Sequence, residues 1–269
     1  MKKLMEYKII SGHTVEVRRT WMASRDCDTR RPRRNRIAGN TSERKIRANE
    51  AEAIKQFARS LNCNVERGWM LVTLKYDNEH LPADREELKK NEGKYLKKLR
   101  AAFREEQGRS PRYYAVQGTW SPAKDRPARF HHHIVIEACS ADMLRSLWHG
   151  GGSVICEDID NRKDHTALAV YLYRNTERGA RGDRRWSTSR GNLLKPVYTE
   201  PVEVWNVEGI EAIPGSVMME MTRLDDEDGN AISSYVRCVL PEKPEVRRGQ
   251  VILPKPPKRG GRKGGGRCT

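Results

Sequence analysis

The segment from Phe130 to Glu137 carries three consecutive histidines in a pattern typical of a β-strand, because branched and aromatic residues alternate along it. Successive side chains on a strand point to opposite faces, so His131 and His133 share one face and His132 lies on the other. Two imidazoles on one face of a rigid strand can bind one divalent ion together. The alternative is a histidine-rich surface strand that binds nothing.

A third ligand would come from the neighbouring strand, which we expect over residues 112–120. If Tyr114 and Val116 face the core, Gln117 points to the same open face as the histidines, and antiparallel strands lie ~5 Å apart. Two imidazoles and one amide oxygen, with open positions, suit Mn²⁺ or Mg²⁺ better than a closed zinc site. Gln117 could equally be an ordinary exposed amide, and Glu137 is a competing ligand farther along the histidine strand.

Two tyrosines occur in the apolar segment from Ala167 to Arg174, which has the pattern of a helix. Tyr171 and Arg174 are three residues apart and share a helix face, whereas Tyr173 lies about 200° around the helix from Tyr171. Only one tyrosine can therefore face a metal. A tyrosine hydroxyl can attack a phosphodiester to give a phosphotyrosyl ester, while a metal polarises the phosphate. Core packing is the usual role of a lone tyrosine, but the nearby two-histidine strand favours chemistry.

Charge indicates the kind of partner. The 269 residues include 52 Lys and Arg against 36 Asp and Glu, a net charge of +16, which suits a polyanion such as nucleic acid. The basic residues cluster in an arm over residues 25–47 and in a loop that begins at residue 178, where a tryptophan is interleaved. Such segments are typical of backbone contacts with a stacking residue. We expect DNA contacts from Arg31, Arg33, Arg34, Lys75, Arg129, Arg178, Arg181, Arg184, Arg185, Trp186, Arg190 and Lys195.

The order of predicted elements indicates the fold. A strand at 69–76, a helix at 84–108, strands at 112–120 and 130–139, a helix from 140 and a strand at 153–156 match the split βαβ plan of ferredoxin-like and RRM-like domains. This plan predicts an α+β fold. Its antiparallel sheet would carry helices on one face, an open second face and the histidine strand near its centre.

The rest of the chain predicts the domain organisation. We expect a basic N-terminal arm and helix at 1–66, a catalytic domain at 67–198, a small β extension at 199–253 and a disordered basic tail at 254–269. No run approaches the ~18 apolar residues of a membrane span, and we expect no secretory signal. Six scattered cysteines indicate reduced thiols, and hence a cytoplasmic protein.

The segments Phe130 to Glu137, Leu168 to Arg174 and Arg184 to Arg190 resemble those of the HUH endonucleases. More closely, they are similar to the rolling-circle replication-associated proteins of bacterial phages and mobile elements. The segment Val72 to Asp77 resembles the first strand motif of that family. The resemblance extends over roughly residues 5 to 240 and is most specific in the histidine strand and the tyrosine helix.

The resemblance implies a rolling-circle replication initiator, a metal-dependent enzyme that nicks and joins single-stranded DNA. It makes His131 and His133 ligands of Mn²⁺ or Mg²⁺ and Tyr171 the nucleophile, which forms a 5′-phosphotyrosine and frees a 3′-OH. The family often has an acidic third ligand where this chain has Gln117, and a lysine where it has Arg174. Arginine keeps its proton at any working pH, so we expect Arg174 to stabilise phosphate charge rather than to donate a proton.

The implied partners are single-stranded DNA, an origin stem-loop, and the helicase and polymerase of a bacterial host, in whose cytoplasm the protein would act. A Walker A motif is absent from the sequence, so we expect no built-in helicase. A homodimer is left open. Two other readings stay open as well: an HUH relaxase or transposase, and a non-catalytic RRM-like protein that binds single-stranded nucleic acid.

Overall fold

The computed structural model describes residues 2–23, 43–177, 185–226, 229–247 and 250–252. The chain divides into two compact units. Residues 1–34 and 197–269 form the terminal unit, and residues 35–196 form the central unit. This division differs from the predicted boundaries, because the N-terminal strands pair with C-terminal ones and the first helix belongs to the central unit.

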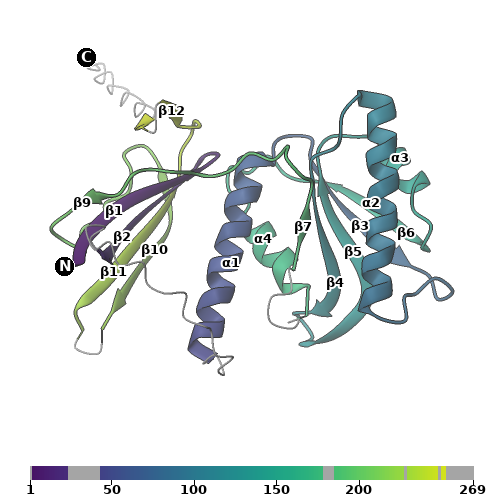
Figure 1. Ribbon diagram of the computed structural model, residues 1–269, viewed down its shortest axis with the longest axis horizontal. Helices are drawn as coiled ribbons and strands as arrows, with labels where there is room; N and C mark the ends of the chain where they lie inside the picture. Colours follow the sequence, from purple (N-terminus) through teal and green to yellow (C-terminus); the bar gives the residue numbers. More distant parts are fainter. Residues whose placement is uncertain (1, 24–42, 178–184, 227–228, 248–249, 253–269) are drawn as a thin grey trace, which may run out of the picture. The chain divides into compact units, whose positions relative to one another are not determined.

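The terminal unit is an antiparallel sheet built from both ends of the chain (Figure 1). The strands β1 (Lys2–Ser11) and β2 (Thr14–Ala23) form a hairpin whose turn contains Gly12, at φ 60°. A left-handed backbone of this kind favours glycine. The sheet order is β10-β11-β2-β1-β8, and β9 also pairs with β1. The later strands are β8 (Val197–Tyr198), β9 (Val202–Glu203), β10 (Val217–Asp225) and β11 (Ala231–Val239), and the separate pair β12 (Glu245–Arg247) and β13 (Gln250–Ile252) follows.

One core holds this terminal sheet together. Val15 and Val17 of β2 and Val236 and Cys238 of β11 are buried side by side, and Ile210 from the preceding loop packs on them. The small β extension expected from the sequence is therefore part of a larger sheet.

The central unit contains the predicted elements in the predicted order. Its strands are β3 (Met70–Tyr76), β4 (Tyr113–Ser121), β5 (Arg126–Ile136), β6 (Gly151–Asp158) and the short β7 (Ser187–Thr188). They form an antiparallel sheet in the order β6-β3-β5-β4-β7. The histidine strand β5 is thus central, as expected, and an α+β fold with antiparallel sheets is confirmed.

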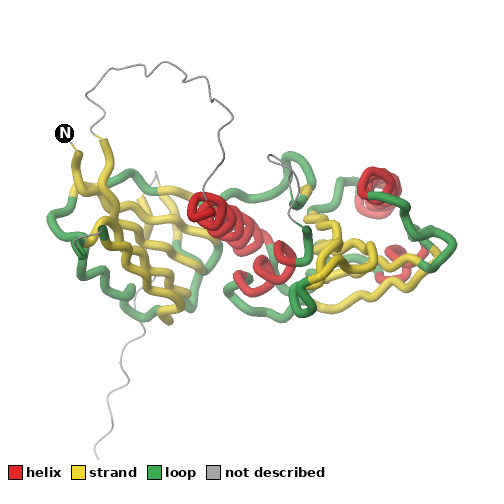
Figure 2. The backbone as a smooth tube through the Cα atoms, turned by 90° about the horizontal axis from the view of Figure 1, so that it is seen from below, coloured by secondary structure: helices red, strands yellow, loops and turns green. Residues whose placement is uncertain are grey.

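Helices cover both faces of the central sheet (Figures 1 and 2). On one face, α2 (Arg85–Gln107) and α3 (Ala141–Ser146) pack against the strands through Leu99, Phe103 and Leu144. On the other face, α1 (Glu43–Asn64) and α4 (Thr166–Arg174) bury Tyr114 of β4. The expectation of an open second face is wrong. The strands carry apolar side chains on both faces of the sheet, and helices bury both faces.

The start and end of α2 follow from its sequence. Asp84 is the N-cap, and its carboxylate accepts a hydrogen bond from the backbone N–H of Glu87 at 2.8 Å. Gly108 ends the helix in a left-handed conformation, as expected. Glu92, which the periodicity alone leaves outside the core, is buried at 7% exposure. Among the described residues, no helix is long and apolar enough to cross a membrane.

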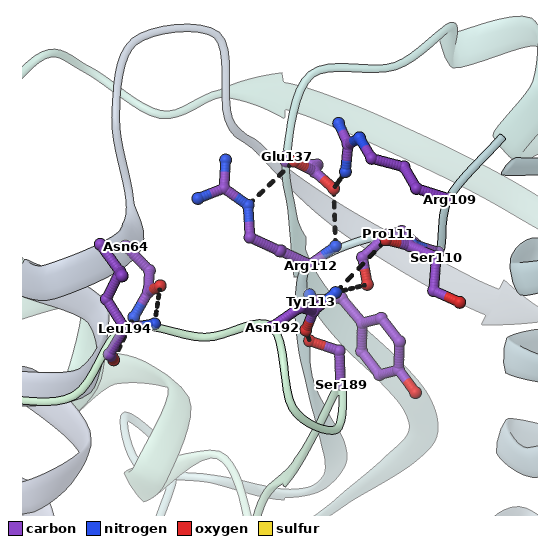
Figure 3. A network of polar contacts seen from close by, with 10 residues as sticks. All are labelled: Asn64, Arg109, Ser110, Pro111, Arg112, Tyr113, Glu137, Ser189, Asn192 and Leu194. Carbon is purple, nitrogen blue, oxygen red and sulfur yellow. Dashed lines mark hydrogen bonds and ion pairs between the residues drawn. The ribbon is translucent and has the colours of Figure 1, made fainter. Parts of the chain in front are cut away.

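A buried carboxylate joins the end of β5 to the start of β4 (Figure 3). Glu137 accepts hydrogen bonds from Arg109 Nη1 at 2.5 Å, from the backbone N–H of Arg112 at 2.7 Å and from Arg112 Nε at 3.0 Å. Burial by itself raises the pKa of Glu137, but these bonds outweigh it and hold the pKa below its usual value. The Glu137 carboxylate is therefore charged at neutral pH and fixes this corner of the sheet.

Replacing Glu137 with glutamine is expected to lower the free energy of unfolding at pH 7 by about 1–3 kcal/mol, since hydrogen bonds to charged groups are lost while Arg109 stays partly solvated. A carboxyl whose pKa is depressed by folding stabilises the protein above its unfolded value of ~4.3, and this stabilisation is lost as the pH falls through the folded value. Urea unfolding at neutral and acid pH measures the difference. A difference from wild type that is equally large in acid would contradict the assignment.

Candidate active site

The Nε2 atoms of the two candidate ligand histidines lie close together. His131 Nε2 and His133 Nε2 are 3.1 Å apart. His131 Nδ1 lies 2.8 Å from the carbonyl oxygen of Arg129, which can only accept, so Nδ1 carries the proton and Nε2 the lone pair. His133 Nδ1 lies 3.1 Å from the hydroxyl of Thr73, directly opposite on β3, which can accept the same kind of bond.

This arrangement fits a divalent cation. Two nitrogens ~2.0–2.1 Å from one ion, at an angle of about 90–110°, are roughly 2.8–3.4 Å apart. The observed 3.1 Å lies in that range. The outer Nδ1 atoms are occupied by backbone and hydroxyl oxygens, which is how metal-binding histidines are commonly oriented. The spacing of His131 and His133 is therefore compatible with a shared cation.

Burial keeps both rings neutral. It lowers the pKa of His133 to about 3, with smaller contributions from the neighbouring histidines, and it also lowers the pKa of His131. A neutral imidazole is the form that binds metal. At neutral pH neither ring has to lose a proton before it binds a cation.

A glycine makes room for His131. Gly118 lies directly opposite His131 on β4. A Cβ atom at this position would be 2.1 Å from His131 Nε2 and 2.3 Å from Cε1. A glycine inside a strand commonly marks such a close approach. The sequence therefore contained a signal for Gly118, but only the structure shows that the His131 ring packs against it.

The tyrosine helix brings Tyr171 to the same place. The rings of Tyr171 and His133 are 5.4 Å apart, at an interplanar angle of 61°. Tyr171 is 45% exposed, so part of its side chain is accessible to solvent. Burial of the ring and the charge of Glu157 raise the pKa of Tyr171, which keeps the phenol protonated at neutral pH.

The other tyrosine points elsewhere. Tyr173 is buried, and the guanidinium of Arg185 lies 4.3 Å from the centre of its ring. The structure therefore agrees with the expectation that only one of the two tyrosines faces the histidines. Arg174, in the last turn of α4, is exposed and makes no hydrogen bond or ion pair within the described residues.

Gln117 lies on the wrong face to join the histidines. It is directly opposite His132 on β5, and direct partners of an antiparallel pair share a face. Val116, opposite His133, occupies the position expected for Gln117. The prediction assumed that the buried residues Tyr114 and Val116 face away from the histidines. They are in fact buried on the same face as the histidines, where α1 and α4 cover the sheet.

In the part of the chain that the structure describes, acidic side chains do not replace Gln117 as a third ligand. Within the described ranges, no group of three or more His, Cys, Asp or Glu residues could hold a metal. The competing ligand Glu137 is taken by Arg109 and Arg112. Among the described residues, His131 and His133 are therefore the candidate metal ligands that the structure brings together.

The predicted DNA contacts have different surroundings. Lys75 lies directly opposite His131, is exposed and contributes to lowering the pKa of that histidine. Arg129 donates to the backbone carbonyls of Tyr76 and Asp77, which ties it to the strand end. Lys195 is exposed. Arg31, Arg33, Arg34, Arg178, Arg181 and Arg184 lie outside the described residues.

Two of the residues expected to contact DNA, Trp186 and Arg185, instead make contacts within the protein. Trp186 stacks on Phe57 of α1, with ring centres 4.7 Å apart and planes within 11°, and packs against the core. Arg185 pairs with Glu50 at 2.9 Å. The loop that carries them is therefore a structural element as well as a basic one.

Replacing Thr73 with valine, which has nearly the same shape, is expected to weaken Mn²⁺ binding by about 10–100-fold, the usual effect of losing an outer partner of a ligand histidine. The reason is that His133 loses the oxygen that orients its ring. Calorimetric titration with Mn²⁺ measures the change, and Thr222→Val, on an exposed strand of the terminal unit, is the control. Equal affinities for the two variants would rule out this orienting role.

Comparisons of the chain with protein-family models, with curated proteins and with solved structures found no match. We therefore infer the function from the geometry of the site and from the motifs in the sequence.

Proposed function

We propose that the protein is a metal-dependent nuclease and joining enzyme for single-stranded DNA, of the HUH class, that initiates rolling-circle replication. One observation carries this proposal: the facing Nε2 atoms of His131 and His133 are 3.1 Å apart, and the ring of Tyr171 lies 5.4 Å from that of His133. The strand order, in which β5 lies between β3 and β4 and β6 lies outside β3, supports a ferredoxin-like plan.

In the proposed reaction the Tyr171 hydroxyl attacks the phosphorus of a phosphodiester. The bond from phosphorus to the 3′ oxygen breaks, the phenol loses its proton, and the 3′ oxygen gains one. The products are a 5′-phosphotyrosyl ester and a free 3′-OH. The reverse attack by a 3′-OH rejoins the strand without another energy source, because the ester keeps the phosphodiester bond energy.

Charged residues around Tyr171 can stabilise this reaction. Arg174 shares the helix face of Tyr171, and Lys75 lies opposite His131. Both are exposed cations that can contact the phosphate as charge shifts on its oxygens. A Mn²⁺ or Mg²⁺ ion held by His131 and His133 would polarise the scissile phosphate.

Overall charge supports a DNA substrate, because a net charge of +16 favours a polyanion. An origin stem-loop and a host helicase and polymerase complete the proposal. A non-catalytic nucleic-acid-binding protein is the second candidate. It accounts for the charge but gives no role to the converging imidazoles and phenol.

A denaturing gel separates these candidates. The full chain is incubated with labelled single-stranded oligonucleotides and Mn²⁺, with and without a chelator. We expect a covalent protein–DNA adduct that depends on the metal and disappears in the variant His131→Ala/His133→Ala. Tight binding without cleavage or adduct, across a broad sequence library, would instead support the binding protein.

A further inference from the structure

A groove of about 890 Å³ lies at the edge of the central sheet, beside β4 and β7. Its walls include Arg85 and Lys89 from the start of α2, Arg190 from the segment after β7, and Trp186. Gln117 and Glu92 form part of its lining on the α2 side. The volume is in the range of pockets that bind a compact organic ligand. We call this site the β4-edge groove.

Three of the four cations that line the β4-edge groove have no partner among the described residues, and the fourth is Arg185. Within the described residues, the side chains of Arg85, Lys89 and Arg190 make no hydrogen bond or ion pair, unlike Arg185, which pairs with Glu50. Unpaired cations around a concave surface raise the local concentration of anions. Guanidinium groups also match the geometry of phosphate oxygens.

The segment that carries Arg190 is fixed (Figure 3). The hydroxyl of Ser189 donates to Asn192 Oδ1 at 2.6 Å, and Asn192 Nδ2 donates to the carbonyl of Pro111 at 3.1 Å. Ser189 is itself buried. Two residues later, the backbone N–H of Leu194 donates to Asn64. Arg190 therefore extends from an anchored backbone, which reduces the conformational cost of binding a phosphate.

The lining of the groove also offers hydrogen-bonding groups. The side chain of Gln117 has both a donor and an acceptor, and it makes no hydrogen bond within the described residues. Glu92 accepts from Ser187 through Oε1, while its Oε2 is 3.7 Å from His132 Nδ1, too far for a direct bond. His132 is completely buried and does not line the groove, and its Nδ1 has no hydrogen-bond partner among the described residues. An edge with mixed donors and acceptors, such as that of a nucleobase, matches the Gln117 amide and the Glu92 carboxylate that do line the groove.

The β4-edge groove and the histidine site involve neighbouring residues of β4 that point to opposite faces of the sheet. Gln117 lines the groove, and the next residue, Gly118, lies under the ring of His131 on the other face. We propose that the groove binds one nucleotide of the single-stranded DNA that is cut at Tyr171, with its phosphate against Arg85, Lys89 and Arg190 and its base toward Gln117. This inference rests on the proposed function and adds a subsite to it.

Binding of uncut DNA tests the groove separately from nicking. The full chain, in the presence of a chelator, is titrated against a fluorescent single-stranded oligonucleotide. We expect Arg85→Ala/Lys89→Ala to bind about 10-fold more weakly or worse, and its salt slope to fall by roughly 0.7 for each lost phosphate contact. The charge-matched control Lys90→Ala/Lys97→Ala changes exposed cations of the same helix that do not line the groove, and we expect less than a twofold effect.

The base contact is tested with oligonucleotides that each lack a single base. We expect wild type to lose affinity at one position and Gln117→Ala to lose none there. Equal affinities of the two double variants, or equal competition by oligoglutamate and by unlabelled DNA, would overturn the proposal. If Arg85→Ala/Lys89→Ala binds DNA more weakly than Lys90→Ala/Lys97→Ala but no tyrosyl adduct ever forms, the proposed nicking activity is wrong and the DNA subsite in the groove is supported. If the adduct forms but the two double variants bind DNA equally, only the proposed subsite is wrong.

Discussion

Replacing Tyr171 with phenylalanine is expected to abolish the covalent protein–DNA adduct and to reduce cleavage of single-stranded DNA by about 10⁴-fold or more, which is the order of loss when a covalent nucleophile is removed. The phenyl ring keeps the contact with His133, so folding and metal binding should be unchanged. Only the hydroxyl that we propose attacks phosphorus is lost. Cleavage and adduct formation are followed on the same denaturing gel.

The adjacent variant Tyr173→Phe is the matched control for this result. Tyr173 is buried beneath Arg185 and lies away from the histidines. It should keep the adduct and most of the cleavage rate. An adduct that survives in Tyr171→Phe, or that is lost equally in both variants, would remove Tyr171 from the proposed role.

Replacing Gly118 with alanine is expected to weaken Mn²⁺ binding by about 10–100-fold, comparable to the loss of an outer-shell contact, and to reduce nicking in parallel. The added Cβ would lie 2.1 Å from His131 Nε2, so the imidazole must leave its position opposite His133. The ring can rotate, and we therefore expect the thermal stability of the fold to change less than the metal affinity. Calorimetric titration and thermal unfolding measure the two effects separately.

The matched control is Gly93→Ala, the same substitution at a position in α2 where an added Cβ causes no clash. A Cβ atom there meets nothing within 4 Å. Gly93→Ala should leave metal binding unchanged and stabilise the helix by about 0.5–1 kcal/mol. If Gly118→Ala binds Mn²⁺ as tightly as Gly93→Ala, the close approach of His131 to β4 does not matter for the metal site.

The elements around the histidines could be predicted because their local patterns are strong. Alternation over residues 130–136 indicates a strand, and the three-residue spacing of Tyr171 and Arg174 places them on one helix face. Together with the order of helices and strands, these patterns were enough to expect a central histidine strand beside a tyrosine helix. Both features are present in the structure.

Long-range features could not be predicted from such patterns. The N-terminal hairpin pairs with strands about two hundred residues later, as in the bond from the Lys8 backbone N–H to Thr199 Oγ1. Nothing local to residues 2–23 indicates this partner. The predicted orientation of the Gln117 side chain was wrong for a different reason. A sheet covered on both sides buries both sets of side chains, so apolar character no longer identifies which face is which.

The central claim is that His131, His133 and Tyr171 form one site that joins DNA to the protein. The most direct measurement is mass spectrometry of the trapped adduct after digestion of both the protein and the DNA. We expect the remaining nucleotide to be attached through its 5′ phosphate to Tyr171, and to appear only in samples treated with a divalent metal. A nucleotide attached to another residue, or an adduct that forms equally well without metal, would contradict this account.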